Sequence, residues 1–557
     1  MIQILDVLWP EILLVVVGCV LLLLGVVQRA AARRFAPVLA IASLGIVFAV
    51  FLWNGPTGSR EFDPWWTTAV YRFQEYVKLI AAGVGILLVL LAWPTNADAT
   101  GNPALQFGHE SGEFFGLMLL SISGILFVAS ANDIIVLFLG IELASIPTYV
   151  LVSISRPLPV AQEAGVKYFF LGAMAAAVML FGFSYLYGVT GETNLDAIAR
   201  ALHTEGGQHD WQLLAVLMVL VGLAFKIAAV PLHSYAGDVY QGAATPVTAF
   251  LAFVPKTSGF VAILKVLFYV GLTGTQQWVV PDTIAKLLWV LAVLSMFVGN
   301  VLGLLQHNVK RVLAYSSVAH SGYMLAGVTA LVTAGGQPEV QAAALGGVLF
   351  YLAAYGIMNT GAFGVLMMLP SRGRGHTGYL EPPGAGPQVP AATGTSAETF
   401  EDIAGQGRNH LALGIAMAVC CWSLTGLPFT IGFFGKVFLI KPAWQAAVGE
   451  VRTRMIWLVI LLVINAAISA AYYLRIIAAM FLRPEPAPPA GTVIAAPAEP
   501  SIASRPWPVL AGIALSVIGT IVFGVDFPAT GSLSQRAQSA HLQVPPPASP
   551  PPVAASR

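Results

Sequence analysis

The feature that most constrains this chain is a succession of long apolar segments with short polar connections between them. A helix needs about 20 apolar residues to cross the hydrocarbon core of a membrane, and about fourteen segments come close to that length. Because lipid offers no hydrogen-bond partners to an open backbone, such a chain must fold as a bundle of helices. We expect the first segment to be retained, since it is too long and too apolar for a cleaved signal peptide. The segments are 10–27, 35–53, 77–93, 114–131, 133–153, 161–187, 211–228, 243–271, 283–304, 311–333, 341–369, 411–440, 453–482 and 506–525.

The composition agrees with a polytopic membrane protein and excludes other classes. Hydrophobic residues make up 57% of the chain and charged residues 10%, which no ordinary water-soluble domain matches. A formal net charge of +1 excludes the strongly basic surface of a typical nucleic-acid-binding protein. The cysteines lie in apolar segments without a CxxC pair, so the sequence indicates no disulfide framework and no zinc or iron–sulfur ligand set.

The distribution of basic residues predicts the orientation in the membrane. Lys and Arg concentrate in the loops that face the cytoplasm. One side of the predicted bundle carries most of them, beginning with the loop after the first helix, and the other side carries fewer. We therefore expect the N-terminus, and with an even number of helices also the C-terminus, to lie on the outer side. The richer side holds Arg29, Arg33, Arg34, Arg156, Lys310, Arg311, Arg372, Arg374, Arg408, Arg483 and Arg505.

Three segments lie outside the membrane pattern. Residues 371–409 are rich in Gly, Pro and Thr and are predicted to form an aqueous loop without a core. Residues 484–505 are Pro/Ala-rich and indicate a linker, and residues 526–557 indicate a tail of similar composition. We interpret these segments as connectors without a catalytic role.

A few ionisable residues fall well inside predicted spans. Such groups are costly in a bilayer, so they face protein or water and usually belong to a transport pathway. Lys265 and Lys286 lie nearer helix ends, where a lysine can equally extend its ammonium to the membrane surface. The stronger candidates are Glu142 in "FLGIELASIPTYVL", Lys226 in "VLVGLAFKIAAVPLHSY", Lys256 in "FVPKTSGF", Lys436 in "GFFGKVFLI" and the titratable His320.

Glu142 and Lys226 are best explained as a pair. A buried carboxylate alone takes up a proton and a buried ammonium alone loses one, whereas two neighbours stabilise each other's charged forms. A change in hydration or in a nearby charge can then move a proton. The central cations are all Lys, which releases its proton on desolvation, while Arg stays charged. This choice favours proton transfer over a fixed structural charge.

Prolines lie close to these lysines. Pro231 follows Lys226 and Pro255 directly precedes Lys256. Pro428 stands eight residues before Lys436. Helix breaks at membrane depth occur where loose backbone is buried or lines a cavity, and transporters place ion sites at such breaks in corresponding positions of two inverted repeats.

Several long motifs resemble a known family. "FLGIELASIPTYVL", "DVYQGAATPVTAFLA", "NVKRVLAYSSVAHSGYMLAG" and "TGLPFTIGFFGKVFLI" are similar to the subunit N family of respiratory complex I, the NADH-quinone oxidoreductase. That family belongs to the antiporter-like, proton-translocating membrane subunits. The resemblance runs from about residue 5 to residue 525.

The resemblance implies a fold and a set of functional residues. The fold would be all-α with about fourteen transmembrane helices, with helices 4–8 (residues 114–271) and helices 9–13 (residues 283–482) as inverted five-helix repeats. Residues 1–93 would supply three preceding helices, residues 506–525 the last one, and helices 7 and 12 would be broken. The implied proton relay is Glu142, Lys226, Lys256, His320 and Lys436.

The resemblance also implies a setting. Flavin, iron–sulfur clusters and quinone would belong to partner subunits, so no cofactor and no metal is expected in this chain. The expected partners are a neighbouring antiporter-like subunit M, small subunits of the K and J type, membrane lipid and protons, without nucleic acid. The expected location is the bacterial plasma (inner) membrane. In "SYAGDVYQGAATP", Gln241 stands where the family has an acid, which removes any role for a carboxylate at that position.

Two other interpretations stay open. A subunit of a multi-subunit cation/proton antiporter would share the architecture and the Glu/Lys set. A purely structural membrane subunit would not need the buried charges, because apolar residues hold helices together at lower cost.

Overall fold

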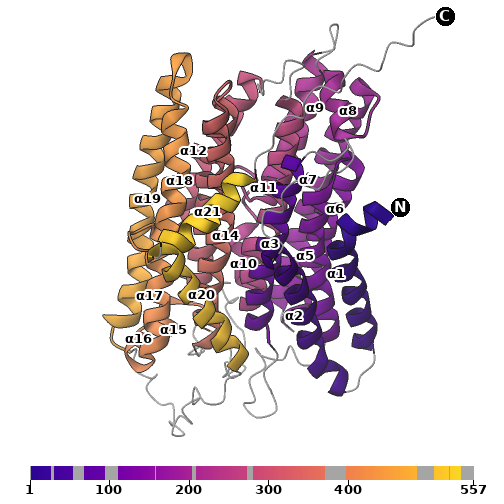
Figure 1. Cartoon of the computed structure of the whole chain (residues 1–557). Helices are drawn as coiled ribbons and strands as arrows, with labels where there is room; N and C mark the ends of the chain where they lie inside the picture. The colour runs from indigo at the N-terminus through magenta and orange to yellow at the C-terminus, as the bar shows by residue number, and fades with distance from the viewer. Residues whose placement is uncertain are drawn as a thin grey trace, which may run out of the picture.

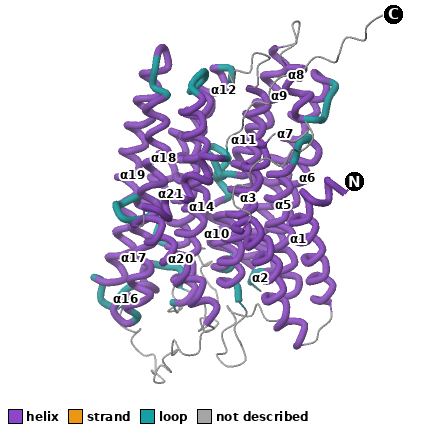
Figure 2. Tube along the Cα trace, in the orientation of Figure 1, coloured by secondary structure: helices purple, strands orange, loops and turns teal. Residues whose placement is uncertain are grey.

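The computed structural model describes residues 2–26, 30–53, 68–93, 111–156, 159–202, 209–271, 280–369, 397–485, 507–525 and 527–540. Within these ranges the chain is helical, as Figure 2 shows, and its only β-type pairing consists of two isolated bridges. One bridge joins Asp133 to Asn194 and the other joins Asn308 to Thr399. The predicted all-α class is therefore confirmed.

The helices stand side by side and follow the predicted order (Figure 1). The first three are α1 (Ile2–Val26), α2 (Ala30–Trp53) and α3 (Thr68–Leu91). The first repeat comprises α5 (Ser111–Ser130), α6 (Ile134–Ile154), α7 (Pro159–Thr190), the broken helix α9 (His209–Lys226) with α10 (Ala236–Gly242), and α11 (Thr245–Gly271). The second comprises α12 (Asp282–Leu304), α13 (Val309–Thr333), α14 (Pro338–Met368), the broken helix α17 (Leu411–Thr425) with α18 (Ile431–Gln445), and α19 (Arg452–Phe481). The last long helix is α20 (Trp507–Val525), and short helices are α8 (Leu195–Leu202), α15 (Phe400–Ile403), α16 (Gln406–Asn409) and α21 (Phe527–Ser539).

The number of membrane spans agrees with the prediction. Among the described residues, 11 helices are long and apolar enough to cross a membrane. Three predicted spans are not among them, and they correspond to α9, α13 and the α17–α18 pair. Two of the three are interrupted helices, namely α9 with α10 and α17 with α18. Each interrupted helix is the fourth of its five-helix set. Breaks at equivalent positions are what an internal repeat of a transporter-like fold requires.

Burial separates central helices from lipid-facing ones. In the membrane-spanning part of α11, 100% of the residues are buried inside the protein. In that of α7, 39% of the residues are buried. The outer face of α7 exposes apolar side chains, among them Phe170, Met174 and Phe181, which is typical of contact with lipid. The interior position of α11 explains why a lysine on it must find a partner within the bundle.

The prediction that residues 371–409 form a loop without a core is wrong for its last part. Residues 397–409 contain α15 and α16, and Ala397, Phe400 and Ile403 are buried. A capping box in which Thr399 and Asp402 bond each other's backbone begins α15. This segment packs as part of the bundle, while residues 371–396 lie outside the described ranges.

The composition of that remaining segment supports a simple prediction. We expect that deletion of residues 377–395 leaves assembly and quinone reduction near normal, because the segment is polar, rich in Pro and Gly and has no periodic apolar face. Native gels and activity of the purified complex test it. Loss of assembly would show that the segment is a docking element instead.

The predicted tail also contains a helix. The sequence indicates a Pro/Ala-rich tail over residues 526–557, but within it α21 (Phe527–Ser539) packs against α14 and α3. Ser534, Ala537 and Ala540 are buried. The helix lacks a long apolar run, so its small buried residues gave no signal in the hydropathy pattern. Residues 541–557 lie outside the described ranges.

Candidate functional site

The first helix break is held in place by the second repeat. The chain leaves helical geometry after Lys226, and the Ser321 hydroxyl of α13 donates to the carbonyl of Ile227 at 2.5 Å. The backbone N–H of Val230 donates to Ser295 Oγ of α12 at 2.9 Å. Irregular backbone at membrane depth needs such partners, because no lipid group can supply them. The interruption predicted from Pro231 is therefore present and stabilised from the neighbouring repeat.

Lys226 and Glu142 form the predicted ion pair. Lys226 Nζ lies 2.9 Å from Glu142 Oε1, and the lysine side chain is 2% exposed against 15% for the glutamate. The same ammonium donates to Ser145 Oγ at 3.0 Å and to Tyr149 Oη at 3.2 Å. Ser145 stands three residues and Tyr149 seven residues after Glu142 on α6, so one helical face supplies all three acceptors. The three donors of the ammonium are satisfied.

Lys256 has a different environment, in which its hydrogen-bond partners among the described residues are neutral. It lies on α11 and is 3% exposed. Its ammonium donates to the carbonyl of Ser317 at 2.5 Å and to Ser317 Oγ at 2.6 Å. It also stands 4.8 Å from the centre of the Tyr355 ring, within the range of a cation–π contact. The Lys256 ammonium is therefore held by neutral groups, whereas the Lys226 ammonium is paired with a carboxylate.

A cavity joins these two lysines. It lies between α9, α10 and α11 and is lined by Lys226 and Lys256, with Tyr168, Tyr235 and Tyr240 around them. Polar groups that line the same small space can hold a bridging water. The cavity therefore offers a route between the ion pair and the second lysine.

His320 lies at the centre of an aromatic cluster. It is 0% exposed. Its Nδ1 is 2.8 Å from Tyr351 Oη and its Nε2 is 3.0 Å from Tyr473 Oη. A tyrosine hydroxyl can both donate and accept. Either ring nitrogen can therefore carry the proton without losing its hydrogen bond.

Two tyrosine rings connect His320 to lysines on either side. The His320 ring lies 5.0 Å from Tyr355, over which Lys256 sits, and 5.4 Å from Tyr323. Lys436 Nζ stands 4.8 Å from the centre of the Tyr323 ring. His320 is also within electrostatic range of both lysines. The predicted relay residues from α11, α13 and α18 are thus gathered in one buried region.

Lys436 occupies the second helix break. It lies on α18, but its ammonium reaches back to the carbonyls of Leu424 at 3.2 Å and Thr425 at 2.6 Å, at the end of α17. Gly426 has a φ of 84°, and a Cβ there would lie 2.6 Å from the Lys436 side chain, so glycine is strongly favoured at this position. Lys226 is the last residue of α9. The Lys436 ammonium therefore meets the C-terminal end of a half-helix, where the helix dipole favours a cation, whereas the Lys226 ammonium points to side chains of α6.

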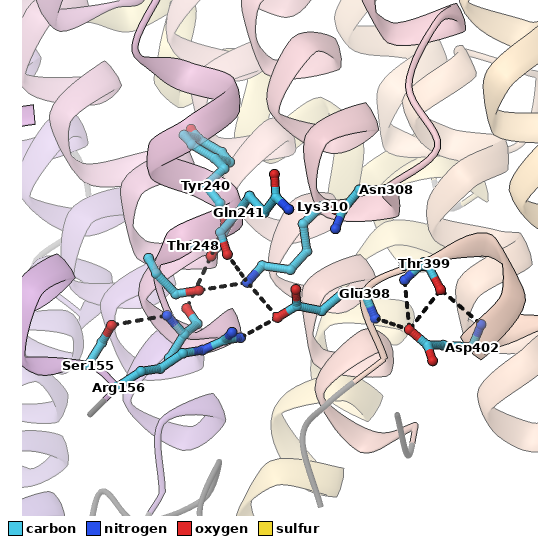
Figure 3. A network of polar contacts seen from close by, with 12 residues as sticks. Ser155, Arg156, Tyr240, Gln241, Thr248, Asn308, Lys310, Glu398, Thr399 and Asp402 are labelled. Atoms are coloured by element: carbon cyan, nitrogen blue, oxygen red, sulfur yellow. Dashed lines mark hydrogen bonds and ion pairs between the residues drawn. The ribbon is translucent and has the colours of Figure 1, made fainter. Parts of the chain in front are cut away.

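The structure also contains a buried ion network that the sequence did not predict (Figure 3). Glu398 Oε1 lies 2.6 Å from Arg156 Nη2 and 3.4 Å from Lys310 Nζ. Lys310 donates further to the carbonyls of Gln241 and Ala243 at the end of α10. The network thus joins the end of α6, the half-helix α10 and the start of α13. The capping-box pattern at Thr399 was the sequence signal that could have revealed an ordered segment here.

Gln241 belongs to a set of polar side chains around Arg311. Its side-chain oxygen accepts from Arg311 at 3.0 Å, and Arg311 also pairs with Asp238 at 2.7 Å. Asp238 in turn lies 3.0 Å from Lys167. Gln241 therefore contributes a neutral hydrogen-bond acceptor to these charged side chains.

The sequence left open whether Lys265 and Lys286 extend to the membrane surface. Their environments in the structure are opposite. Lys286 is 66% exposed and pairs with Asp282, which fits a lysine at the membrane surface. Lys265 is 1% exposed and donates to the carbonyl of Ala131. The Lys265 ammonium therefore does not extend to the membrane surface, and that interpretation is wrong for this residue. Among the described residues, no group of three or more His, Cys, Asp or Glu side chains could hold a metal ion.

Comparison with known proteins identifies the family of this chain. Residues 131–469 match the family described as NADH:quinone oxidoreductase/Mrp antiporter, TM. NADH-quinone oxidoreductase subunit N of Trichlorobacter lovleyi is 36% identical over 482 residues, covering 86% of this chain and 88% of that protein. The Rhodospirillum rubrum protein of the same name is 33% identical, covering 85% of this chain and 86% of that protein. This chain belongs to the subunit N family.

Solved structures place the subunit N family among related complexes. A chain of respiratory complex I from Thermus thermophilus with bound aureothin has a TM-score of 0.67 and 27% identity, covering 94% of this chain and 98% of that chain. A chain of the Mrp complex from Dietzia has a TM-score of 0.70 and 20% identity, covering 95% of this chain and 97% of that one, so that likeness concerns the fold alone. The predicted family is confirmed. As a subunit N, the chain is a multi-pass membrane part of a multi-subunit respiratory complex of the NADH-quinone oxidoreductase type.

Proposed function

We propose that this subunit N carries protons through a buried relay of Glu142, Lys226, Lys256, His320 and Lys436, while partner subunits reduce quinone. The observation that supports this proposal most is the placement of Lys226 and Lys436 at two equivalent helix breaks, with Lys256 and His320 between them. A structural subunit would gain nothing from these groups, since apolar residues hold helices together at lower cost.

In this proposal the Glu142–Lys226 pair is the first proton-holding site. While the pair is closed, the carboxylate stabilises the charged ammonium. When Glu142 is neutralised or its hydration changes, the ammonium keeps only Ser145 and Tyr149 and releases its proton toward the cavity. Lys256 at the far side of the cavity accepts it. The amine left on Lys226 then takes up the next proton.

Transfer beyond Lys256 depends on the neutral groups around His320. The two tyrosine hydroxyls keep the ring in place in either tautomer. A proton on Lys256 disfavours one on His320, and Lys436 acts on the ring in the same way, because like charges in a low-dielectric interior repel. Occupation of one site therefore promotes emptying of the next, and the sites titrate as a coupled set.

The proposed cofactors, partner subunits and membrane location are supported by the family and by the distribution of Lys and Arg. A flavin, iron–sulfur clusters and quinone would be held by partner subunits, and the neighbours would be a subunit M and small subunits of the K and J type. The bias of Lys and Arg toward one set of loops supports an inner-membrane protein with both termini on the outer side. Arg156 and Lys310, assigned to the same side, meet at Glu398, which supports that assignment.

Replacement of Lys256 by methionine tests the proposed function. The variant removes the ammonium but fills a similar volume, so we expect an assembled complex whose NADH-driven proton translocation falls by about tenfold, a modest loss for a positioned proton-transfer group. Proton uptake into vesicles is the measurement, and Lys286→Gln at an exposed position is the matched control. Normal translocation by assembled Lys256→Met would contradict the relay. Translocation that requires sodium would favour the cation/proton antiporter instead.

A further inference from the structure

A second buried Glu–Lys pair lies among the first three helices. Glu11 on α1 and Lys78 on α3 form an ion pair of 2.7 Å between Glu11 Oε1 and Lys78 Nζ, with side chains 0% and 3% exposed. Ser130 at the end of α5 donates to the same carboxylate oxygen at 2.6 Å. This arrangement repeats the chemistry of Glu142, Lys226 and Ser145, in which one carboxylate, one lysine and one serine meet between helices.

Lys265 adds a further lysine next to that pair, as Lys256 does next to the other. Both lie on α11, nine residues apart, which is about 13 Å along the axis and on opposite helix faces. The Lys265 ammonium donates to the carbonyl of Ala131, the residue after Ser130. It is within electrostatic range of Glu11 and Lys78. Both pairs are therefore accompanied by a buried lysine from α11 that bonds a backbone carbonyl.

Several polar atoms around this second pair have no hydrogen-bond partner among the described residues. They are Glu11 Oε2, both side-chain amide atoms of Gln74, and the hydroxyl of Tyr76. Gln74 precedes Lys78 by one helical turn on α3. Buried polar atoms are costly unless water or a proton satisfies them. A free carboxylate oxygen beside a lysine is a place where a proton can bind.

A pocket lies beside this region. It lies between α3 and α21 and is lined by Arg72, Glu75, Tyr76 and Arg536, among others. Glu75 and Tyr76 belong to the same turn of α3 as Lys78, and Glu75 is within electrostatic range of the Lys78 ammonium. Water in the pocket can therefore reach Glu75 and Tyr76, one turn or less along α3 from Lys78.

We infer that Glu11, Lys78 and Lys265 form a second proton-exchange site, which opens to the surface through the pocket between α3 and α21. This inference rests on the proposed proton-carrying function of the chain. In the transfer step the Lys265 ammonium gives up a proton and becomes a neutral amine. Glu11 Oε2 gains that proton and becomes a carboxylic acid, while Lys78 keeps its charge. Glu11 then releases the proton to water in the pocket and returns to the carboxylate.

Two substitutions at Lys265 separate proton exchange from a structural role. Lys265→Arg retains the charge and a donor for the Ala131 carbonyl but does not release its proton. A structural contact would thus survive in the arginine variant. For a proton-exchange site we expect NADH-driven proton translocation by assembled Lys265→Arg to fall by about tenfold, as in Lys265→Met. Unchanged translocation by assembled Lys265→Arg would overturn the inference.

A second measurement does not depend on how well arginine fits. Glu11→Gln preserves the side-chain volume and an acceptor for Ser130 and Lys78, but it cannot become a carboxylic acid. Infrared difference spectra of the complex during NADH turnover are expected to contain a protonated-carboxyl band that Glu11→Gln lacks. Absence of any such difference between the two complexes would overturn the inference. Lys286→Gln serves as the control in both measurements, because it lies at an exposed position.

A comparison with Lys226 distinguishes the two proposals. If Lys226→Ala translocates protons normally, the proposed function itself fails. If Lys226→Ala is impaired while Lys265→Arg and Glu11→Gln behave like the unaltered complex, only the second site fails.

Discussion

Replacement of Lys226 by alanine is expected to leave the complex assembled and to reduce NADH-driven proton translocation by about tenfold or more. The substitution removes the switchable partner of Glu142 and one of the two lysines that line the cavity. Assembly should survive because the Glu142 side chain is 15% exposed, so that water can reach its carboxylate when the lysine is lost. Proton uptake into vesicles, with native gels to check assembly, measures both effects.

An arginine at the same position provides the sharper version of this test. Lys226→Arg keeps a positive charge near Glu142, Ser145 and Tyr149, so a purely structural ion pair would be preserved. A guanidinium does not release its proton at any physiological pH, and we therefore expect translocation to remain impaired. If assembled Lys226→Arg translocates protons at the unaltered rate, the assignment of Lys226 as a relay is wrong.

Replacement of Glu398 by alanine is expected to have the largest effect on stability. Glu398 lies between Arg156 and Lys310, whose side chains are 5% and 0% exposed. Without the carboxylate, two buried cations face each other uncompensated, and breaking a buried pair in this way costs about 3–5 kcal/mol. The network also fixes the end of the half-helix α10 against α13, so we expect less assembled complex and a lower melting temperature.

A matched control is available at the surface. Asp282 pairs with Lys286 and Arg454 but is 54% exposed, and an exposed pair contributes about 0–1 kcal/mol. Asp282→Ala should therefore assemble and melt nearly as the unaltered complex does. Equal melting temperatures for Glu398→Ala and Asp282→Ala would show that the buried network contributes no more than a surface pair.

The sequence predicted those parts of the fold that depend on long apolar runs and on helix-breaking residues. The spans, the two interruptions and the ion pair of Glu142 with Lys226 follow from local patterns that the bilayer makes strict. Glu11 was missed because a single acid near the start of an apolar segment resembles an ordinary end of a helix. Its burial depends on α3 and α5, which are remote in sequence.

The ion network around Glu398 could not be predicted for a related reason. Its residues come from a loop, a helix start and a segment rich in Gly and Pro, and no spacing relates them. Lys265 stands close enough to a helix end for extension to the surface, and only the packing of α5 against α11 shows that the surface is out of reach. Tertiary packing determines these environments.

The most direct test of the relay is a structure of the complete respiratory complex at a resolution that shows bound water. The relay predicts ordered water in the cavity between Lys226 and Lys256, and a continuous path of water and polar side chains past His320 to Lys436. The side chains of Glu142, Lys226, Lys256, His320 and Lys436 should all point into that path. Dry apolar gaps between successive members, or side chains turned toward lipid, would contradict the relay.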